Sequence, residues 1–417
     1  MEHRAPNDPR PSAIVVGLDC ITGLQSARIL AARGVPVVGI AANAGHFCAR
    51  TRVVERVVEA PTSGPGLVDA LARLAPELRP SGAAFLLPCT DAAVLTVSAE
   101  RDRLDPAYRL VLPAHDVVER LLDKVPFAEL ARVHGLPVPP SVTVGDMDDA
   151  GHAAEVLRFP VVVKPPVKSA AWLAAARAKA IRVDDAAALT ALAERALRWS
   201  PVLVAQSWIA GPEDRLISFN GYFDRAGTAQ AAFMARKIRQ WPPETGTSSL
   251  GEEIRDDEAL DVALRLFGIA GFHGLAYLEM KRDERNGDLA IIEANIGRPT
   301  GRSAIAERGG VELLLTAYSD ALGLPLPAAR QQTYRGARWI YWRHDLQAAA
   351  VRIRRGDLSL GGWLRSVRGR PIEAVGSLRD PLPFLLDAAG AFRSAVHAGR
   401  RRVARRKGRS PAAVAPR

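Results

Sequence analysis

Residues 274–295 read GLAYLEMKRDERNGDLAIIEAN, two apolar runs on either side of a polar turn that contains glycine. This pattern predicts a β-hairpin. Glu279 lies in the first run, and Glu293 and Asn295 lie in the second. Two carboxylates and an amide oxygen suit a hard cation such as Mg²⁺, which prefers oxygen ligands. The alternative for these three side chains is a solvated polar face on an edge hairpin.

The length of the turn decides which side chains share a face. A two-residue turn at Asn286-Gly287 would place Glu279 opposite Ala294, on the wrong face. A three-residue loop at 285–287, with its glycine in the left-handed region, would place Glu279 opposite Glu293. Asn295, two residues further on, would then share their face. We therefore expect the three-residue loop.

The segments around this hairpin also carry groups that bind nucleotides. A loop rich in glycine and arginine, IGRPTGRS, follows at 296–303. Upstream, FPVVVK at 159–164 is a β-branched run that ends in a lysine, and VLVAQSWIAGPE at 202–213 combines a strand, an aromatic residue, Gly-Pro and an acid. Arginine can bind a phosphate or a carboxylate through two parallel hydrogen bonds. Together these segments indicate a site for a nucleoside triphosphate.

These motifs, in this order, resemble the ATP-grasp superfamily over residues 121–326, and more specifically the D-alanine–D-alanine ligases and related carboxylate–amine ligases. The resemblance implies ATP as cofactor, with Mg²⁺ or alternatively Mn²⁺. It implies α- and β-phosphate contacts from Lys124 and Lys164, an adenine contact from Gln206, a backbone hinge at Trp208 and Ile209, a ribose contact from Glu213, a γ-phosphate contact from Lys237, and a metal site of Glu279, Glu293 and Asn295.

The activity implied by the resemblance is an ATP-dependent carbon–nitrogen ligase that joins a small carboxylate to an amine through an acyl phosphate. Lys237 and Arg298 would bind the transferring phosphoryl group. Arg239, together with Arg236, would bind the acceptor carboxylate or replace an arginine of the D-alanine ligases whose position is Tyr277 here. The alternatives are a kinase that phosphorylates a small-molecule hydroxyl and a nucleotide-binding protein without turnover.

The loop after the phosphate lysine departs from the family, because residues 165–179 contain no glycine. Its Ala-rich sequence favours a short helix or an ordered flap. Such a flap would present Trp172 to the substrate, with Lys168 or Arg177 reaching the phosphates. The alternative is a mobile loop that packs Trp172 against the small domain.

The fold class expected is α/β, with an N-terminal parallel sheet followed by the α+β ATP-grasp unit. Strands at 13–17, 35–41 and 83–88 alternate with helices at 22–33 and 66–78, which predicts a parallel sheet. Asp19 and the Thr90-Asp91 pair follow two of the strands, and we expect them to cap helices.

The expected division is a Rossmann-like domain (1–120), a linker helix with the small ATP-grasp subdomain (121–200), a larger subdomain with an antiparallel sheet (201–330), a C-terminal appendage (331–390) and a basic tail (391–417).

Composition is consistent with a cytoplasmic enzyme that acts on small molecules, and it leaves a homo-oligomer open. The net charge is +11, but residues 391–417 hold nine basic residues and no acid, so the remainder is close to +2. That tail is a solvated end or a weak contact with an anionic membrane surface. Nucleic-acid binding is not expected, since the tail has no aromatic residues for stacking. No apolar run approaches the roughly 18 residues of a membrane span, no apolar signal segment opens the chain, and three cysteines show no metal-binding spacing.

Overall fold

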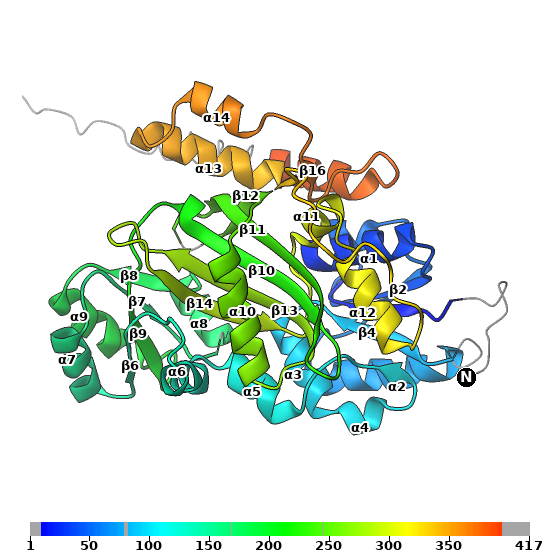
Figure 1. Ribbon diagram of the computed structural model, residues 1–417, viewed down its shortest axis with the longest axis horizontal. Coiled ribbons are helices and arrows are strands. Elements are labelled where there is room, and N and C mark those ends of the chain that lie inside the picture. The colour runs from blue at the N-terminus through cyan, green and yellow to red at the C-terminus, as the bar shows by residue number, and fades with distance from the viewer. Residues whose placement is uncertain (1–9, 79–81, 168, 245, 394–417) are drawn as a thin grey trace, which may run out of the picture.

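The structure is a computed structural model that describes residues 10–78, 82–167, 169–244 and 246–393. Three sheets organise the described residues (Figure 1). An N-terminal parallel sheet, a small antiparallel sheet and a large, mainly antiparallel sheet follow one another along the chain. The fold is therefore the expected α/β arrangement.

The N-terminal sheet has five parallel strands in the order β3-β2-β1-β4-β5. Its central strands are fully buried, as expected for a parallel sheet with helices on both faces. Its elements are β1 (Ala13–Val16), α1 (Ile21–Ala32), β2 (Val37–Ala41), η1 (Phe47–Arg50), β3 (Arg56–Glu59), α2 (Gly64–Leu78), β4 (Ala84–Pro88), α3 (Asp91–Ala99), α4 (Arg101–Leu104) and β5 (Tyr108–Arg109).

The helix caps in this domain differ in part from expectation. Cys20, not Asp19, caps α1, because its Sγ accepts a hydrogen bond from the Gly23 amide at 3.4 Å. The Asp19 carboxylate instead accepts from the Asn43 amide at 3.1 Å. Thr90 caps α3 as expected. Asp91, the first residue of α3, forms an ion pair with Arg298 that is described below.

The small subdomain is a four-stranded antiparallel sheet in the order β6-β9-β7-β8. The hinge strand β9, which the sequence division assigned to the large subdomain, pairs here with β6 and β7. The helical linker breaks at Asp123, whose side chain caps the second helix. The elements are α5 (His115–Leu122), α6 (Lys124–Val133), β6 (Ser141–Val144), α7 (Met147–Val156), β7 (Val161–Lys164), α8 (Ala170–Ala176), β8 (Ile181–Val183), α9 (Ala186–Ala196) and β9 (Leu203–Ser207).

The glycine-free segment forms the short helix α8, with Ser169 as its N-cap. Trp172 does not face the substrate cavity. It is fully buried in the core of the small subdomain, edge-on to Trp199, and its Nε1 donates to the Ala178 carbonyl at 2.8 Å. The alternative placement of Trp172 therefore holds. Lys168 lies outside the described residues.

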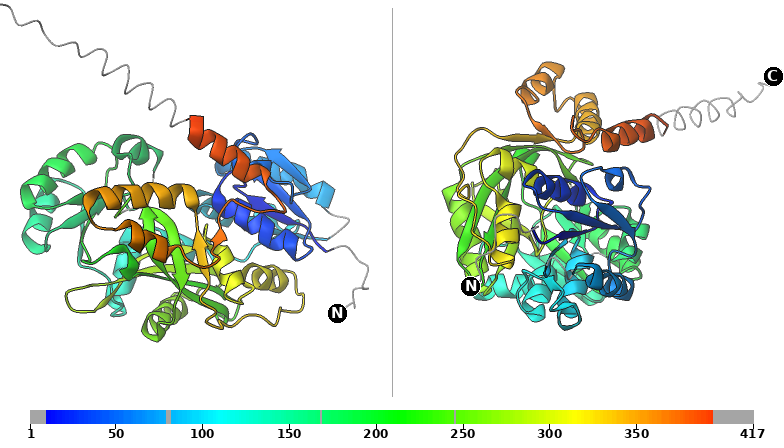
Figure 2. Two further views of the ribbon diagram at one scale, coloured as in Figure 1. Left: turned by 90° about the horizontal axis from the view of Figure 1, so that it is seen from above. Right: turned by 90° about the vertical axis from the view of Figure 1, so that its right-hand side faces the viewer.

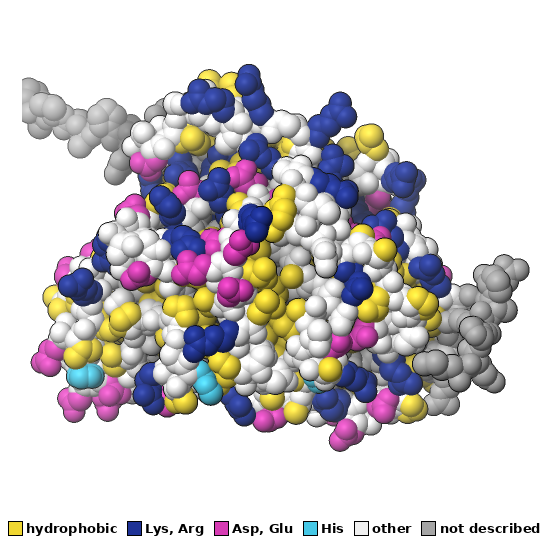
Figure 3. All heavy atoms as spheres, in the orientation of Figure 1, with side chains coloured by type: hydrophobic (Ala, Val, Ile, Leu, Met, Phe, Trp, Pro, Cys, Tyr) yellow, Lys and Arg dark blue, Asp and Glu magenta, His cyan; other side chains and the backbone are white. Residues whose placement is uncertain are grey.

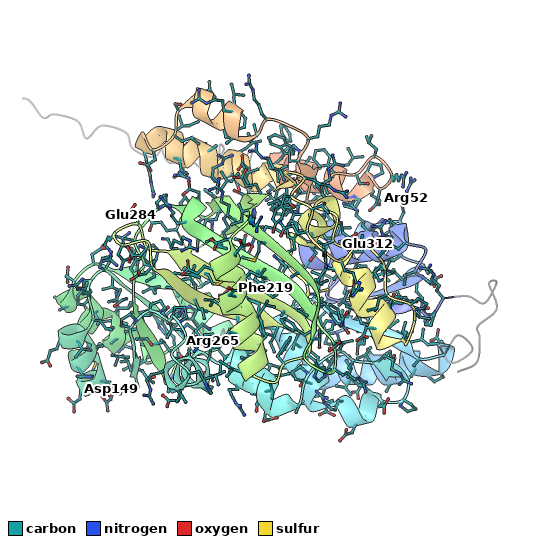
Figure 4. All side chains as sticks on the ribbon, viewed as in Figure 1. Arg52, Asp149, Phe219, Arg265, Glu284 and Glu312 are labelled. Carbon is teal, nitrogen blue, oxygen red and sulfur yellow. The ribbon has the colours of Figure 1, made fainter. Side chains whose placement is uncertain are left out.

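The large sheet runs β14-β13-β10-β11-β12-β15-β16. Helix α10 packs against one face, where Phe267 contacts Phe219 and Phe223, and Figure 4 shows Phe219 at the middle of the sheet. Helices α11 and α12 cover part of the other face. The elements are η3 (Glu213–Arg215), β10 (Leu216–Phe223), β11 (Ala229–Trp241), β12 (Thr247–Glu253), α10 (Asp257–Ile269), β13 (Gly274–Arg282), β14 (Leu289–Ile296), α11 (Ser303–Arg308) and α12 (Leu313–Ala321).

The C-terminal appendage is integrated into the molecule. Its strand β15 (Arg338–Ile340) extends the large sheet by pairing with β12, and β16 (Ile372–Glu373) follows. Helices α13 (Trp342–Arg355) and α14 (Leu360–Ser366) cross the edge of that sheet, and basic side chains, which in these two helices are all arginine, gather over them (Figure 3). Figure 2 shows the last described segment beside the N-terminal domain, where Asp380 pairs with Arg28 at 2.8 Å.

The described residues contain no helix that is long and apolar enough to cross a membrane. The membrane contact suggested for the basic tail concerns residues 391–417, of which 394–417 lie outside the described residues.

Candidate functional site

The hairpin β13–β14 places Glu279 opposite Glu293, and Tyr277 opposite Asn295. The pairing is the expected one, but the turn is not. The Asp283 amide donates to the Asp288 carbonyl, so the loop has four residues, and Gly287 adopts φ +81°. Such a loop alone would shift the register by one residue.

A β-bulge at Ile292 restores the pairing. Met280 pairs with Ile291 while Glu279 pairs with Glu293, so Ile292 is the extra residue of β14. Ile291 and Ala294 consequently both face the core beneath the sheet. The sequence-based prediction named the right partners with a loop one residue shorter than the real one and without a bulge. The bulge could not be predicted, because it leaves no local signal in the sequence.

The metal-ligand candidates share the cleft face of the sheet and line one cavity of about 440 Å³. The Asn295 amide donates to Glu293 Oε1 at 3.3 Å. Glu279 lies 2.8 Å from Lys237 Nζ. Two carboxylates and an amide oxygen, partly neutralised by a lysine, fit a divalent cation that takes its other oxygens from phosphates or water.

The charge on Glu279 is held in place by its neighbours. Burial is the largest influence on this carboxyl and opposes its ionisation, but the charge and hydrogen bond of Lys237, together with the Arg302 charge, keep the pKa of Glu279 below its ordinary value. The Tyr277 hydroxyl donates to Glu279 Oε2 at 2.8 Å and accepts from Arg302 Nη2 at 2.9 Å. Burial and the Glu279 charge raise the pKa of Tyr277, so its hydroxyl remains a donor.

The two phosphate candidates from the small subdomain lie in the same cavity. Lys164 Nζ donates to Gln206 Oε1 at 2.8 Å, which ties the phosphate lysine to the adenine candidate. Lys124 Nζ donates to the Pro166 carbonyl at 2.7 Å. Arg298 joins them from the loop after β14, where it pairs with Asp91 at 2.5 Å and donates to the Asn295 amide oxygen.

The hinge candidates Trp208 and Ile209 follow β9 and also line the cavity. The Trp208 amide is engaged, since it donates to the Pro160 carbonyl at 2.9 Å. Lys281 Nζ donates to the Ile209 carbonyl at 2.8 Å and lies 5.1 Å from the centre of the Trp208 ring. The hairpin loop also contacts this region, as the Glu284 amide donates to the Ala210 carbonyl (Figure 4). The β13–β14 hairpin therefore contacts the segment that follows β9.

Two of the candidates lie apart from the cavity lining. Glu213 is buried, and its carboxylate accepts from the backbone amides of Gln240 and Glu244 at 3.1 and 3.0 Å. Arg239 forms a fully buried ion pair with Asp345 of α13, with its Nε 2.8 Å from Oδ1. Arg239 thus anchors the appendage to β11. Because its side chain does not line the cavity, we do not propose a substrate contact for it. Strand β11 has register shifts on both sides of Arg239, and for this reason Arg239 does not share the cleft face with Lys237, although it lies only two residues further along the strand.

The sequence reasoning missed several residues of the cavity. Lys281 could have been found, because it lies two residues after Glu279 on the same face. Arg302 belongs to the Gly- and Arg-rich loop, but only Arg298 was singled out. Trp339, Tyr341 and His344 come from the appendage, and no local pattern connects them to the hairpin.

Comparisons with known proteins identify relatives of this chain. The chain is 23% identical to D-aspartate ligase from Enterococcus faecium (strain Aus0004) over 252 residues, which cover 58% of this chain and 59% of that protein. It is 23% identical to the N-terminal section of the carbamoyl phosphate synthase large chain from Methanopyrus kandleri over 378 residues, or 86% of this chain and 63% of that one. The chain therefore spans about three fifths of the length of these relatives.

A solved structure shows the same fold. The biotin carboxylase domain of Hydrogenobacter thermophilus 2-oxoglutarate carboxylase, in complex with MgADP, superimposes with a TM-score of 0.60 at 16% identity, covering 77% of this chain and 71% of that one. No family model matches the sequence.

Proposed function

We propose, from the ATP-grasp fold that this chain shares with these ligases, that it is an ATP-dependent carboxylate–amine ligase. One observation carries the proposal. Glu279, Glu293 and Asn295 share one face of a hairpin and line a single cavity with three lysines from three different elements, Lys124, Lys164 and Lys237. Such a set of charges is suited to a nucleoside triphosphate and its metal ion.

In the proposed reaction, an oxygen of the substrate carboxylate attacks the γ-phosphorus of ATP, and the bond from that phosphorus to the bridging oxygen of ADP breaks. The acyl phosphate then reacts with an amine. The nitrogen bonds to the carbonyl carbon and loses a proton, and inorganic phosphate leaves. No protein nucleophile is required, because catalysis rests on positioning and on neutralising negative charge.

The residues of this chain would divide that work among them. Glu279, Glu293 and Asn295 would hold Mg²⁺, which neutralises phosphate charge when bound, and Mn²⁺ would substitute for it. Lys124 and Lys164 would bind the α- and β-phosphates, while Lys237 and Arg298 would bind the transferring group. Adenine would lie against the hinge, read by Gln206, Trp208 and Ile209. For Glu213 we propose support of the ribose-side wall, through the backbone amides that it binds.

Trapping with hydroxylamine tests the reaction type. Purified protein is incubated with ATP, Mg²⁺, hydroxylamine and a panel of small carboxylic acids and amino acids, and both ADP and hydroxamate are measured. Hydroxamate formed together with ADP is the expected result, because hydroxylamine intercepts an acyl phosphate. ADP without hydroxamate, together with a phosphorylated alcohol, would show a kinase instead. ATP that binds without any ADP release would show a nucleotide-binding protein.

We also propose that the protein acts in the cytoplasm. ATP as a substrate supports this, and so do the three cysteines, which are all unpaired.

A further inference from the structure

The appendage contributes a wall to the functional cavity. Trp339 of β15, Tyr341 just before α13 and His344 within α13 all line it. Ile21 and Thr22, from the start of α1, complete this part of the lining. A segment that extends the sheet thus also closes the site, which gives the appendage a role beyond stability.

The absence of a side chain at Gly251 leaves room for Arg302 beside this wall. On the cleft face of the sheet, Gly251 of β12 pairs with Lys237 on one side and with Trp339 on the other. A Cβ at this position would lie 3.3 Å from Arg302 Nη1 and 3.1 Å from the Arg236 carbonyl oxygen. Arg302 Nη1 therefore lies over the glycine, next to the strands that carry Lys237 and Trp339.

Arg302 and Trp339, which flank Gly251, each carry a buried donor with no hydrogen-bond partner among the described residues, namely Arg302 Nη1 and Trp339 Nε1. Their residues are only 6% and 2% exposed. Buried donors are almost always satisfied in folded proteins. Two such donors in the lining of one cavity indicate an acceptor that arrives with a ligand.

We propose that Arg302 and Trp339 form the subsite for the carboxylate that is activated, and that this substrate is a monocarboxylic acid with an uncharged, apolar body. A guanidinium and an indole N–H suit a carboxylate, which only accepts hydrogen bonds. Arg302 also reaches Glu279 through the Tyr277 hydroxyl, which places the carboxylate beside the candidate metal ligands.

The surrounding wall determines the rest of the substrate class. It presents Ile21 and the rings of Trp339 and Tyr341, and none of its residues is acidic. His344 adds no charge at neutral pH, because burial and the nearby Arg343 lower its pKa to about 4. This subsite rests on the proposed ligase function, since it assigns one substrate of that reaction.

The test compares Trp339→Phe with Trp363→Phe. The first change removes the indole donor from the cavity and keeps an aromatic ring. The second makes the same chemical change at a tryptophan of α14 whose Nε1 donates to Asp345 at 3.0 Å, outside the cavity lining.

Hydroxamate formation is followed with acetate, isovalerate, phenylacetate and succinate as carboxylates. Trp339→Phe should raise the KM of the best monocarboxylate about three- to tenfold, the effect of one hydrogen bond, and leave the KM for ATP unchanged. Trp363→Phe should change neither.

The outcomes separate the two proposals. Hydroxamate formation with equal carboxylate KM values in both variants would overturn the subsite and leave the ligase function standing, and so would a preference for succinate. If the wild type forms no hydroxamate, the ligase function fails, and the subsite is then decided by thermal shift with isovalerate and phenylacetate in the absence of ATP. A shift that Trp339→Phe loses and Trp363→Phe keeps would support the subsite, and a shift retained by both, or absent from the wild type, would overturn it.

Discussion

Glu279 shows how single residues are set up at this site. It is paired with Lys237, receives a hydrogen bond from Tyr277 and faces Glu293 across the hairpin. Two carboxylates this close repel each other, so a cation on their open side is electrostatically favoured. The lysine and tyrosine hold Glu279, and Asn295 orients Glu293. The pair is thus held on the cleft face before a ligand arrives.

Replacing Glu293 by alanine should lower ADP production by more than about 100-fold, the effect expected when one preorganised charge contact to a transition state is lost. The fold should remain, because the core residues of β14 face the other way. The steady-state rate of ADP release measures the effect, with circular dichroism as the check on folding. Glu284→Ala, in the exposed loop of the same hairpin, is the matched control and should retain activity. Near-normal turnover in Glu293→Ala would refute the metal assignment.

At the scale of elements, α8 is a packed helix at the position where the ligases that this sequence resembles have a glycine-rich loop. Its tryptophan completes the core of the small subdomain and its N-cap serine accepts from the Trp172 amide. Lys179, three residues after the helix, still lines the cavity. The helix therefore supports the strand that carries Lys164, while Lys179 beyond it lies in the cavity lining.

Trp172→Ala should destabilise the protein by about 3–5 kcal/mol, the usual effect of removing a buried aromatic side chain. Leu173→Ala changes the next residue of the same helix, which is 45% exposed, and should have little effect. Urea unfolding followed by tryptophan fluorescence gives both values. Equal stability of the two variants would mean that Trp172 is not part of the core.

The contact between α1 and α11 predicts a dependence of stability on pH. Burial raises the pKa of Glu307 to about 7, although Arg33 at 2.9 Å opposes the shift. The pKa of Glu307 is therefore higher in the folded protein than in the unfolded chain, where it is about 4.5. The stabilisation from this group is then fully present below pH 4.5 and is lost as the pH rises through 7. The wild type should therefore lose up to about 3 kcal/mol through this group between these pH values.

Glu307→Gln removes this titration and preserves the shape of the side chain. Unfolding free energies measured at pH 5 and pH 8 should then differ less in the variant than in the wild type. Arg33 keeps a second partner in Glu312, at 2.8 Å, so the variant does not leave it unpaired. An identical pH dependence in both proteins would contradict the assignment.

At the scale of the whole molecule, the appendage joins parts of the chain that are far apart in sequence. Asp380 accepts from the side chains of Arg28 and Thr51 and from the Arg52 amide. Gln25 of α1 donates to the Ala374 carbonyl, and Arg239 binds Asp345 at the other side of the appendage. The appendage therefore connects the N-terminal domain to the large sheet across the cavity wall that it forms.

Asp380→Ala should destabilise the protein by about 3–5 kcal/mol, because it leaves the largely buried Arg28 without its carboxylate. Asp116→Ala removes a carboxylate from an exposed pair with Arg120 and should cost less than about 1 kcal/mol. Thermal unfolding of both variants gives the comparison. If the two changes were equal in effect, the appendage would contribute nothing through this contact.

The sequence by itself determined the parallel N-terminal sheet and the two strands of the β13–β14 hairpin. These follow from period-2 alternation and apolar runs, which depend on local burial and can be read along the chain. It also placed ten of the candidate ligand residues that line the cavity, because their order along the chain is that of a known fold. Only the tertiary structure decided the bulge at Ile292, the burial of Trp172 and the withdrawal of Arg239 into a pair with Asp345. It alone brought Trp339 and Arg302 into the lining of one cavity. Contacts between distant segments depend on how sheets and helices pack, and packing between them leaves no periodic trace in either segment.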